Sequence, residues 1–474
     1  MENRSIAPRV KSLNSGLLIG LIFLSLGGCR PAPQEKVIDI PVTEPESTGW
    51  TITNQGKHTA MFTLDINGQF WLTTEKIVSR LKAESPDEKA FVLKSLAYVH
   101  QLSRNSPPLT DDKWIHSPEV FLNSLGKGYC DDRAAALCRI WQQAGLPARI
   151  WRLEGHTVPE VQLQGRWQLY DPETGVYFLK DSSTVCSVEE VANGEARYFS
   201  LHNAIYPLNP ENSTLLFLDK YLSQEDNSIS DWYNTDIPVP DSTFQLPAKA
   251  AISCCVPGEQ GQSYWFAKVT LPPHSSGQLQ APLILAQRPE IWSSLFPKTD
   301  SLYTAVKIQN PGPDTLALYY YVNPFAPGLQ PQNRFIMSGV GAAQLTLSLF
   351  PKSQSGPKGF FYLDELRERL LTSGELSGFI QNILPNLPEI KDFAGLPDFF
   401  HAYLLLQNMP PAEMEIRQKA FQERFDIARK IILQHPDIEE RIVRNPVFLL
   451  LALEYYGKEA DVKELATFLE TLSL

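Results

Sequence analysis

A segment bounded by glycines at both ends constrains this chain more than any other part of its sequence. Gly126 and Gly128 interrupt what precedes it, and Gly145 with Pro147 ends it. Between them, apolar residues recur at helical spacing from Cys130, namely Ala134, Leu137, Cys138 and Trp141. The pattern predicts a helix that carries Cys130 in its first turn. A helix N-terminus favours the thiolate form of a cysteine, because unpaired N–H groups and the helix dipole face the sulfur.

A hairpin is predicted directly after this helix. Residues 148–153 and 156–163 are strand-like, and residues 167–170 form a returning strand. Gln164-Gly165 suits a two-residue turn between the last two of these strands. The segment therefore predicts a small antiparallel sheet packed beside the helix.

The register of this hairpin decides which side chains meet. A two-residue turn pairs Leu163 with Arg166 and places His156 opposite residue 173. Asp171 then shares the face of His156, and diagonal neighbours lie about 7–8 Å apart between Cα atoms, so the carboxylate can hold the imidazole. A three-residue turn without a bulge would place the two side chains on opposite faces.

Residues 119–178 resemble the transglutaminase-like superfamily, a branch of the papain-like cysteine enzymes. The landmarks of that family occur here in order: Gly128-Tyr129-Cys130, Gly145-Leu146-Pro147-Ala148-Arg149, His156, Trp167 and Asp171-Pro172. The resemblance implies that Cys130 is the nucleophile and that His156 deprotonates it and later protonates the leaving amine. It also implies that Asp171 orients His156, as in other catalytic triads.

Two features of this stretch depart from the family pattern or leave it incomplete. Pro159 stands where the family has a more strand-friendly residue, and this predicts a strand at an edge or a bulge, because proline cannot donate a ladder hydrogen bond. The oxyanion partner is unassigned, with the amide of Cys130 available and Trp114 and His116 as further candidates.

Other chemistries find little support. His156 and Glu160 would form a metal pair only on a helix, which Pro159 disfavours, and no third ligand is evident. Nucleotide, dinucleotide and serine-hydrolase motifs are missing from the sequence. We therefore expect no metal and no cofactor.

The N-terminus resembles an export signal. Basic residues precede a ten-residue apolar run, Leu17–Leu26, which is too short to span a membrane. The sequence Leu-Gly-Gly-Cys at 26–29 resembles a bacterial lipobox, which implies cleavage before Cys29 and its lipidation. Residues 1–28 are then a lipoprotein signal peptide and 29–48 a tether. The alternative is an ordinary cleaved signal peptide in which Cys29 is incidental.

Charge and cysteine content restrict the partners and the redox chemistry. The chain has 42 basic and 53 acidic residues, a net charge of −11, so nucleic acid is a poor partner. Export permits disulfides, but six cysteines in 474 residues are no disulfide scaffold. The pairing of Cys138, Cys186, Cys254 and Cys255 stays open, although a bridge between the adjacent Cys254 and Cys255 is disfavoured by disulfide geometry.

The predicted fold class is α+β. A papain-like transglutaminase core at 49–205 is followed by a β-sandwich-like domain of immunoglobulin type at 240–355, where short strands recur about every ten residues. A helical domain completes the chain at 356–474, with one helix expected at 415–433.

These features favour a lipid-anchored cysteine peptidase, amidase or transamidase of the cell envelope, on the periplasmic or extracellular side. Its partners would be a protein or peptide substrate, the membrane through the N-terminal lipid, and an envelope protein. The alternative is a catalytically silent envelope scaffold or binding lipoprotein, because most of the chain lies outside the catalytic region.

Overall fold

The computed structural model describes only part of the chain. The described residues are 33–40, 47–66, 71–105, 113–209, 213, 216, 218–224, 227–230, 242–257, 265–286, 302–325, 333–351, 368, 371, 393–406 and 410–432. The predictions for the signal peptide, Cys29 and most of the C-terminal domain lie outside these residues. In the described part, no helix is both long and apolar enough to cross a membrane.

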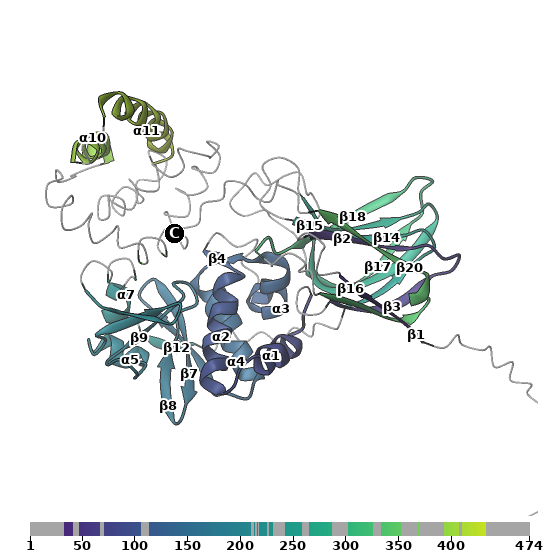
Figure 1. Cartoon of the computed structure of the whole chain (residues 1–474), viewed down its shortest axis with the longest axis horizontal. Coiled ribbons are helices and arrows are strands. Elements are labelled where there is room, and N and C mark those ends of the chain that lie inside the picture. The colour runs from purple at the N-terminus through teal and green to yellow at the C-terminus, as the bar shows by residue number, and fades with distance from the viewer. Residues whose placement is uncertain are drawn as a thin grey trace, which may run out of the picture.

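A group of helices forms the centre of the molecule in Figure 1. The predicted helix is confirmed as α4 (Cys130–Gln143). Gly145, two residues after its end, has a positive φ of 85°, as is common for a glycine that terminates a helix. Leu137 and Trp141 of α4 lie in the same core as Phe91 and Leu96. The remaining helical segments of this part are α1 (Thr74–Ala83), α2 (Glu88–Gln101), η1 (Lys113–His116), α3 (Pro118–Val120) and the π-helix η2 (Phe121–Leu125).

The predicted hairpin is confirmed beside these helices. Strands β6 (Ala148–Leu153), β7 (His156–Leu163), β8 (Arg166–Leu169) and β12 (Ser228–Ser230) form a sheet in the order β12-β6-β7-β8. Leu163 pairs with Arg166, as the two-residue turn requires. Gln164 and Gly165 both have positive φ, at 52° and 77°, which is typical of the turns that match the twist of a hairpin.

Short elements complete this part of the fold. A three-stranded sheet contains β9 (Val176–Leu179), β10 (Tyr198–Leu201) and β11 (Ala204–Pro207). The helices α5 (Val188–Ala192) and α7 (Leu218–Leu222) accompany it, and β4 (Arg104–Asn105) pairs with β5 (Lys127–Gly128). Phe178, Phe199 and Tyr221 share the core between these elements and the hairpin.

An eleven-stranded sheet lies beside the helices and forms one end of the molecule in Figure 1. It curls around one core, in which Trp50, Phe244, Ala267 and Phe335 are buried. The immunoglobulin resemblance of this region stays a prediction. The strands are β1 (Gln34–Asp39), β2 (Ser47–Asn54), β3 (Ala60–Ile66), β13 (Thr243–Leu246), β14 (Ala251–Pro257), β15 (Trp265–Leu271), β16 (Ser275–Ala286), β17 (Leu302–Asn310), β18 (Leu316–Val322), β19 (Arg334–Val340) and β20 (Leu345–Pro351), with the 3₁₀ turn η3 (Ala342–Gln344) before the last.

The first strands of the chain belong to this sheet. This differs from the expected tether at 29–48, because β1 pairs with β19, and from the expected boundary at residue 49. β2 pairs with β14 and β20, and β3 pairs with β13 and β19. The alternating burial of β3, with every second side chain in the core, fits a strand that has one face toward the sheet interior. Residues 47–66 therefore pack with strands that follow about 180 to 300 residues later, and the helical part begins at α1.

The large sheet contacts the helices through η2, the segment just before Cys130. The hydroxyl of Ser124 donates to Tyr321 O at 2.9 Å and accepts from Ile284 N at 3.1 Å. Asn323 Nδ2 donates to the carbonyls of Leu102, at 2.7 Å, and Leu122, at 2.8 Å. These buried hydrogen bonds fix the segment that leads into α4 against strands of the other domain.

The C-terminal part is described only in pieces. η6 (Phe393–Gly395), α10 (Leu396–Leu406) and α11 (Pro411–Ile432) pack together, with Phe400 stacked on Phe421 at 4.0 Å between ring centroids. The helix expected at 415–433 is thus present as α11. Glu368 contacts His100 of α2 and His202 in the turn between β10 and β11. Every cysteine among the described residues is free, and the sulfurs of Cys254 and Cys255 lie 3.0 Å apart without a bond.

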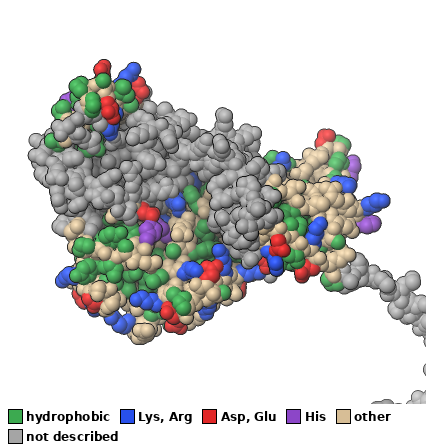
Figure 2. Space-filling model, viewed as in Figure 1, with side chains coloured by type: hydrophobic (Ala, Val, Ile, Leu, Met, Phe, Trp, Pro, Cys, Tyr) green, Lys and Arg blue, Asp and Glu red, His purple; other side chains and the backbone are tan. Residues whose placement is uncertain are grey.

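On the face of the molecule in Figure 2, Lys and Arg side chains of the described residues are interspersed with Asp and Glu. Such a surface gives no concentrated positive field to attract a polyanion.

Candidate active site

The loop before α4 places Cys130 at a helix N-terminus. Gly128 has no room for a side chain, because a Cβ there would lie 2.4 Å from the Asp132 carboxylate and 2.7 Å from the ring of Phe121. Asp132 Oδ2 accepts a 2.8 Å hydrogen bond from Tyr129 N, which closes the first turn of the helix. The glycine two residues before Cys130 therefore allows the close approach of loop and helix that fixes the cysteine.

The surroundings of the two cysteines of α4 differ. Cys130 is partly exposed, whereas Cys138 is buried in the core below it. Burial raises the pKa of Cys138 to about 12, so this thiol is inert at neutral pH.

Burial, together with the neighbouring Asp132, raises the pKa of Asp131 to about 6. The charge beside Cys130 therefore changes in the mildly acidic range.

Pro159 ends the ladder between β7 and β8. Gln162 N donates toward β6, to Pro147 O at 2.8 Å, so the backbone nitrogens at odd positions, including that of Pro159, face β8. The ladder stops at Glu160 opposite Leu169. One long hydrogen bond follows, from Tyr170 N to Pro159 O at 3.5 Å, and proline has no N–H to return it. β7 lies inside the sheet, but its first half has no ladder partner on the β8 side.

The chain turns where the ladder stops, and this turn carries Asp171. Asp171 forms an isolated bridge with Val176, and its Oδ1 accepts a 2.8 Å hydrogen bond from Glu173 N. Gly175 in this turn has a φ of 69°. Asp171 therefore meets His156 from a tight turn and not from the returning strand that the sequence predicted.

His156 and Asp171 form a buried pair. His156 Nε2 lies 3.1 Å from Asp171 Oδ2, and both side chains are at most 1% exposed. Two further groups hold the same carboxylate oxygen: the hydroxyl of Tyr221 donates to it at 2.6 Å, and that of Thr174 at 2.8 Å. Tyr221 OH also lies 3.2 Å from His156 Nε2. The imidazole is thus fixed through one nitrogen by a carboxylate that is itself fully hydrogen-bonded.

His156 and Asp171 shift each other's pKa so that both groups are charged at neutral pH. Burial alone would lower the pKa of His156, but the charge and hydrogen bond of Asp171, with a smaller effect of Cys130, raise this pKa to about 10. Burial alone would raise the pKa of Asp171, but His156 and the hydroxyls of Tyr221 and Thr174 hold it far below its usual value. At neutral pH the site therefore holds an imidazolium beside a carboxylate.

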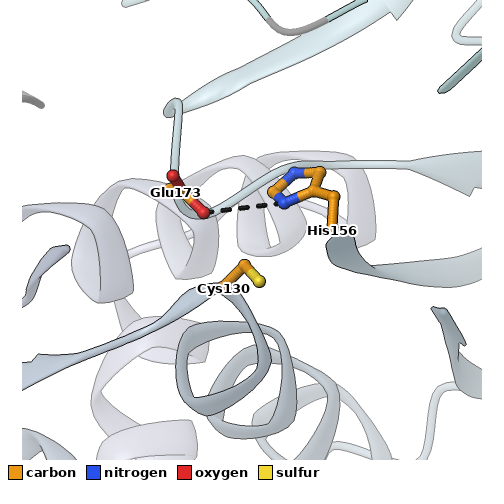
Figure 3. A group of neighbouring side chains, drawn as sticks. All are labelled: Cys130, His156 and Glu173. Carbon is orange, nitrogen blue, oxygen red and sulfur yellow. Dashed lines mark ion pairs between the residues drawn. The ribbon is translucent and has the colours of Figure 1, made fainter. Parts of the chain in front are cut away.

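The other imidazole nitrogen faces Cys130 and Glu173, as Figure 3 shows. Glu173 Oε2 lies 3.6 Å from His156 Nδ1, and one ligand atom from each of the three residues lies within 4.8 Å of the others. Asn105 Nδ2 donates to Glu173 Oε1 at 2.6 Å. The structure therefore brings together all three predicted residues, Cys130, His156 and Asp171, and adds a second carboxylate.

A second ion pair, in which the carboxylate is buried and the arginine is partly exposed, lies behind the hairpin. Glu160 is fully buried and accepts hydrogen bonds from Arg149 Nε at 2.7 Å, Trp151 Nε1 at 2.6 Å and Val188 N at 2.6 Å. The guanidinium of Arg149 also lies over the ring of Trp167, at 4.1 Å from its centroid. These contacts account for Arg149 and Trp167 as packing partners, and they exclude Glu160 as a metal ligand.

The candidates for oxyanion binding lie as follows. His116 Nδ1 is 2.9 Å from Asp132 Oδ1, so this side chain pairs with the first turn of α4. The side chain of Trp114 lies outside the described residues. The amide of Cys130 at the start of α4 remains the candidate donor.

Sequence reasoning missed two members of this site. Glu173 occupies the position opposite His156 in the predicted register, so that register contained a usable signal. Tyr221 comes from the five-residue helix α7, 50 residues after Asp171, and no motif marks it.

Comparison with protein-family models matches residues 75–172 to the transglutaminase-like superfamily. The matched segment begins in α1 and ends at Pro172, directly after Asp171, so it contains Cys130 and His156 but neither Glu173 nor Tyr221. No curated protein and no solved structure matches the chain.

Proposed function

Because residues 75–172 are a transglutaminase-like superfamily domain, we propose that this protein is a cysteine enzyme that cleaves or transfers an amide acyl group through a thioester. The observation that carries the proposal is the position of His156, with Nε2 on Asp171 and Nδ1 toward Cys130 and Glu173. One ring nitrogen is thus fixed and the other faces the nucleophile, which is the division of roles that a catalytic triad needs.

The reaction begins with attack of the Cys130 sulfur on the amide carbonyl carbon. An imidazolium next to a cysteine stabilises the thiolate that attacks. The C–N bond then breaks, and Nδ1 of His156 gives its proton to the leaving amine, which leaves a thioester at Cys130. The amide of Cys130 is the proposed donor to the oxyanion that forms in each step.

The acceptor of the acyl group decides the overall reaction. Water gives a peptidase or amidase, and a primary amine gives a transamidase. We favour hydrolysis, because water is present at about 55 M and an amine-specific site must exclude it. In either case neutral His156 takes a proton from the acceptor, and the thioester bond breaks to regenerate the cysteine.

The first test is the reactivity of Cys130 toward iodoacetamide, read by mass spectrometry as a function of pH. We expect rapid labelling at neutral pH that is lost in His156→Ala. Cys138 in the same helix is an internal control, because it is buried. Labelling of Cys130 as slow as that of Cys138, and unchanged in His156→Ala, would overturn the proposal.

The second test identifies the reaction. The chain is incubated with a glutamine-containing peptide library, with and without a fluorescent primary amine, and the products are identified by mass spectrometry. Cleaved or deamidated peptides indicate hydrolysis, and amine-labelled peptides indicate transamidation. Cys130→Ser is the control, and products that persist in this variant would contradict a Cys130 thioester.

Export and lipidation are a further part of the proposal. They are supported by the apolar run Leu17–Leu26 and the Leu-Gly-Gly-Cys sequence that ends at Cys29. We expect a radiolabelled fatty acid, fed to bacterial cells that produce the chain, to be attached to the wild-type protein and not to the Cys29→Ala variant. Equal labelling of both would contradict lipidation at Cys29.

One observation favours the alternative, a catalytically silent scaffold for an envelope partner. The carboxylate of Glu173 lies 3.6 Å from His156 Nδ1, the nitrogen that must serve Cys130. If Glu173 holds that nitrogen permanently, the domain binds partners without turnover. Glu173→Gln separates the two functions, since iodoacetamide labelling that appears only in this variant would support the scaffold.

A further inference from the structure

We propose that Cys130, His156 and Glu173 form a binding site for a thiophilic divalent cation of the zinc class, and that the bound metal reversibly inhibits the enzyme. The ligand atoms are Cys130 Sγ, His156 Nδ1 and Glu173 Oε2. This proposal departs from the expectation of no metal. Metal binding itself follows from the geometry alone, whereas the inhibition rests on the proposed function.

The spacing of the three atoms suits one metal ion. They all lie within 4.8 Å of one another, with 3.6 Å between His156 Nδ1 and Glu173 Oε2. Zinc binds sulfur at about 2.3 Å and nitrogen or oxygen at about 2.0–2.2 Å in tetrahedral geometry. Tetrahedral ligand atoms are then roughly 3.3–3.8 Å apart. A small movement of the partly exposed Cys130 side chain closes the remaining gap.

The other two ligands, His156 and Glu173, are already oriented by hydrogen bonds to neighbouring side chains. Asp171 holds His156 Nε2 at 3.1 Å, the carboxylate–histidine arrangement that fixes the other nitrogen toward a metal. Asn105 donates to Glu173 Oε1 at 2.6 Å, and Oε2 of the same carboxylate lies 3.6 Å from His156 Nδ1. Hydrogen bonds of this kind orient the ligands in metal sites.

Charge also favours a dication here. Acyl transfer uses the carboxylate of Asp171 but has no role for that of Glu173, which is 4% exposed beside the same imidazole. On binding, Cys130 loses its thiol proton and His156 Nδ1 loses its proton to solvent, so that a thiolate, a neutral imidazole and a carboxylate surround the metal. Sulfur and nitrogen ligands select zinc-like ions over Mg²⁺ or Ca²⁺, which prefer oxygen.

Three protein ligands leave a fourth position for water, on the side where Cys130 is partly exposed. A sulfur bound to the metal has no free thiolate to attack an amide. The metal-bound state is therefore inactive, and a chelator restores the free cysteine.

The experiment titrates the metal-free full chain with ZnCl₂ by calorimetry, and with CoCl₂ by absorption spectroscopy, which reports thiolate–cobalt bonds directly. MgCl₂ is the ion control. We expect one site per chain, a thiolate–cobalt band that is lost in Cys130→Ser, and Zn²⁺ affinity that falls roughly tenfold or more in Glu173→Gln. Cys138→Ser and Glu195→Gln are matched controls that keep full affinity, with circular dichroism to verify folding.

Unchanged Zn²⁺ affinity in both Cys130→Ser and Glu173→Gln would overturn the site. Inhibition is read separately, as protection of Cys130 from iodoacetamide by ZnCl₂ and its reversal by a chelator. Metal binding without such protection would overturn the inhibitory role, as would an amide-cleaving activity that rises with ZnCl₂. Slow labelling of Cys130 in metal-free protein would count against the proposed function and leave the metal site standing.

Discussion

The two sides of the candidate active site are held in place by different interactions. The Cys130 side depends on the large sheet: Ser124 bonds to β18, and Asn323, directly after β18, bonds to Leu122 in the segment before α4. The His156 side is held within its own domain by buried charges, with Asp171 under the imidazole and the Arg149–Glu160 pair behind the hairpin. Damage to the sheet should therefore displace Cys130, whereas damage to the hairpin charges should affect His156 and the stability of the fold.

The largest expected effect comes from Asp171→Asn. The change removes the charge that fixes His156, and the rate of acyl transfer should fall about 10³-fold or more. Because Asp171 raises the pKa of His156 to about 10, the alkaline limb of the wild-type activity profile should lie near that pH. In the variant this limb should move toward neutral pH. Asp426→Asn on the exposed side of α11 is the control, and an unmoved limb would contradict this role of Asp171.

The same pair predicts how the stability of the fold depends on pH. The pKa of His156 rises from about 6.5 in an unfolded chain to about 10 in the folded one. The stabilisation by this pair is therefore complete between the unfolded pKa values of the two groups, about 3.9 for the aspartate and about 6.5 for the histidine. It is lost as the pH rises through about 10, and also at acid pH, because the pKa of Asp171 is lowered in the fold. Urea denaturation across this range should show a smaller loss in Asp171→Asn than in the wild type. An equal loss of unfolding free energy in the wild type and in Asp171→Asn would mean that other groups cause the pH dependence.

The next effect is on stability. Arg149→Ala leaves the fully buried Glu160 without its charged partner and should lower the free energy of unfolding by about 3 kcal/mol. Arg166→Ala is the matched control on β8 of the same sheet, because Arg166 pairs with Glu190 at the surface with 48% of its side chain exposed. That change should cost less than about 1 kcal/mol. Similar losses in the two variants, measured by urea denaturation, would show that burial does not distinguish the pairs.

A smaller effect tests the Cys130 side. Asn323→Ala leaves the buried carbonyls of Leu102 and Leu122 unpaired and should lower the free energy of unfolding by about 2 kcal/mol. Asn310→Ala removes a similar set of carbonyl contacts, to Leu271, Pro272 and Asp314, but within the large sheet. The two variants should lose similar stability, and only Asn323→Ala should slow the labelling of Cys130. Slower labelling in both would mean that the effect is not transmitted by the segment before α4.

The parts of the site that the sequence predicted are those set by local patterns. The helix from Cys130 and the turn at Gln164-Gly165 follow from periodicity and from residues that tolerate positive φ. The approach of Asp171 to His156 was predicted, but from an extended ladder, whereas Pro159 ends that ladder early. Non-local pairing was not accessible, because nothing within residues 47–66 specifies partners almost 200 residues away.

Tyr221 is the member of the site that local patterns could not indicate, and Tyr221→Phe tests whether the His156 side depends on it. The hydroxyl donates to Asp171 Oδ2 at 2.6 Å and lies 3.2 Å from His156 Nε2. Its loss removes one hydrogen bond to a buried charge, which is worth about 1.5–3 kcal/mol. Thr174 still donates to the same oxygen at 2.8 Å, so the imidazole should be loosened and not released.

We therefore expect about a tenfold slower rate of Cys130 labelling at neutral pH in Tyr221→Phe, which corresponds to the low end of that range. Tyr206→Phe is the control, because Tyr206 packs against the same core and stacks on Phe199. If Tyr221→Phe labels at the wild-type rate, Thr174 and His156 alone suffice to position Asp171. If it labels as slowly as Asp171→Asn, the hydroxyl and the carboxylate act as one unit, and the base would depend on an element outside the 75–172 domain.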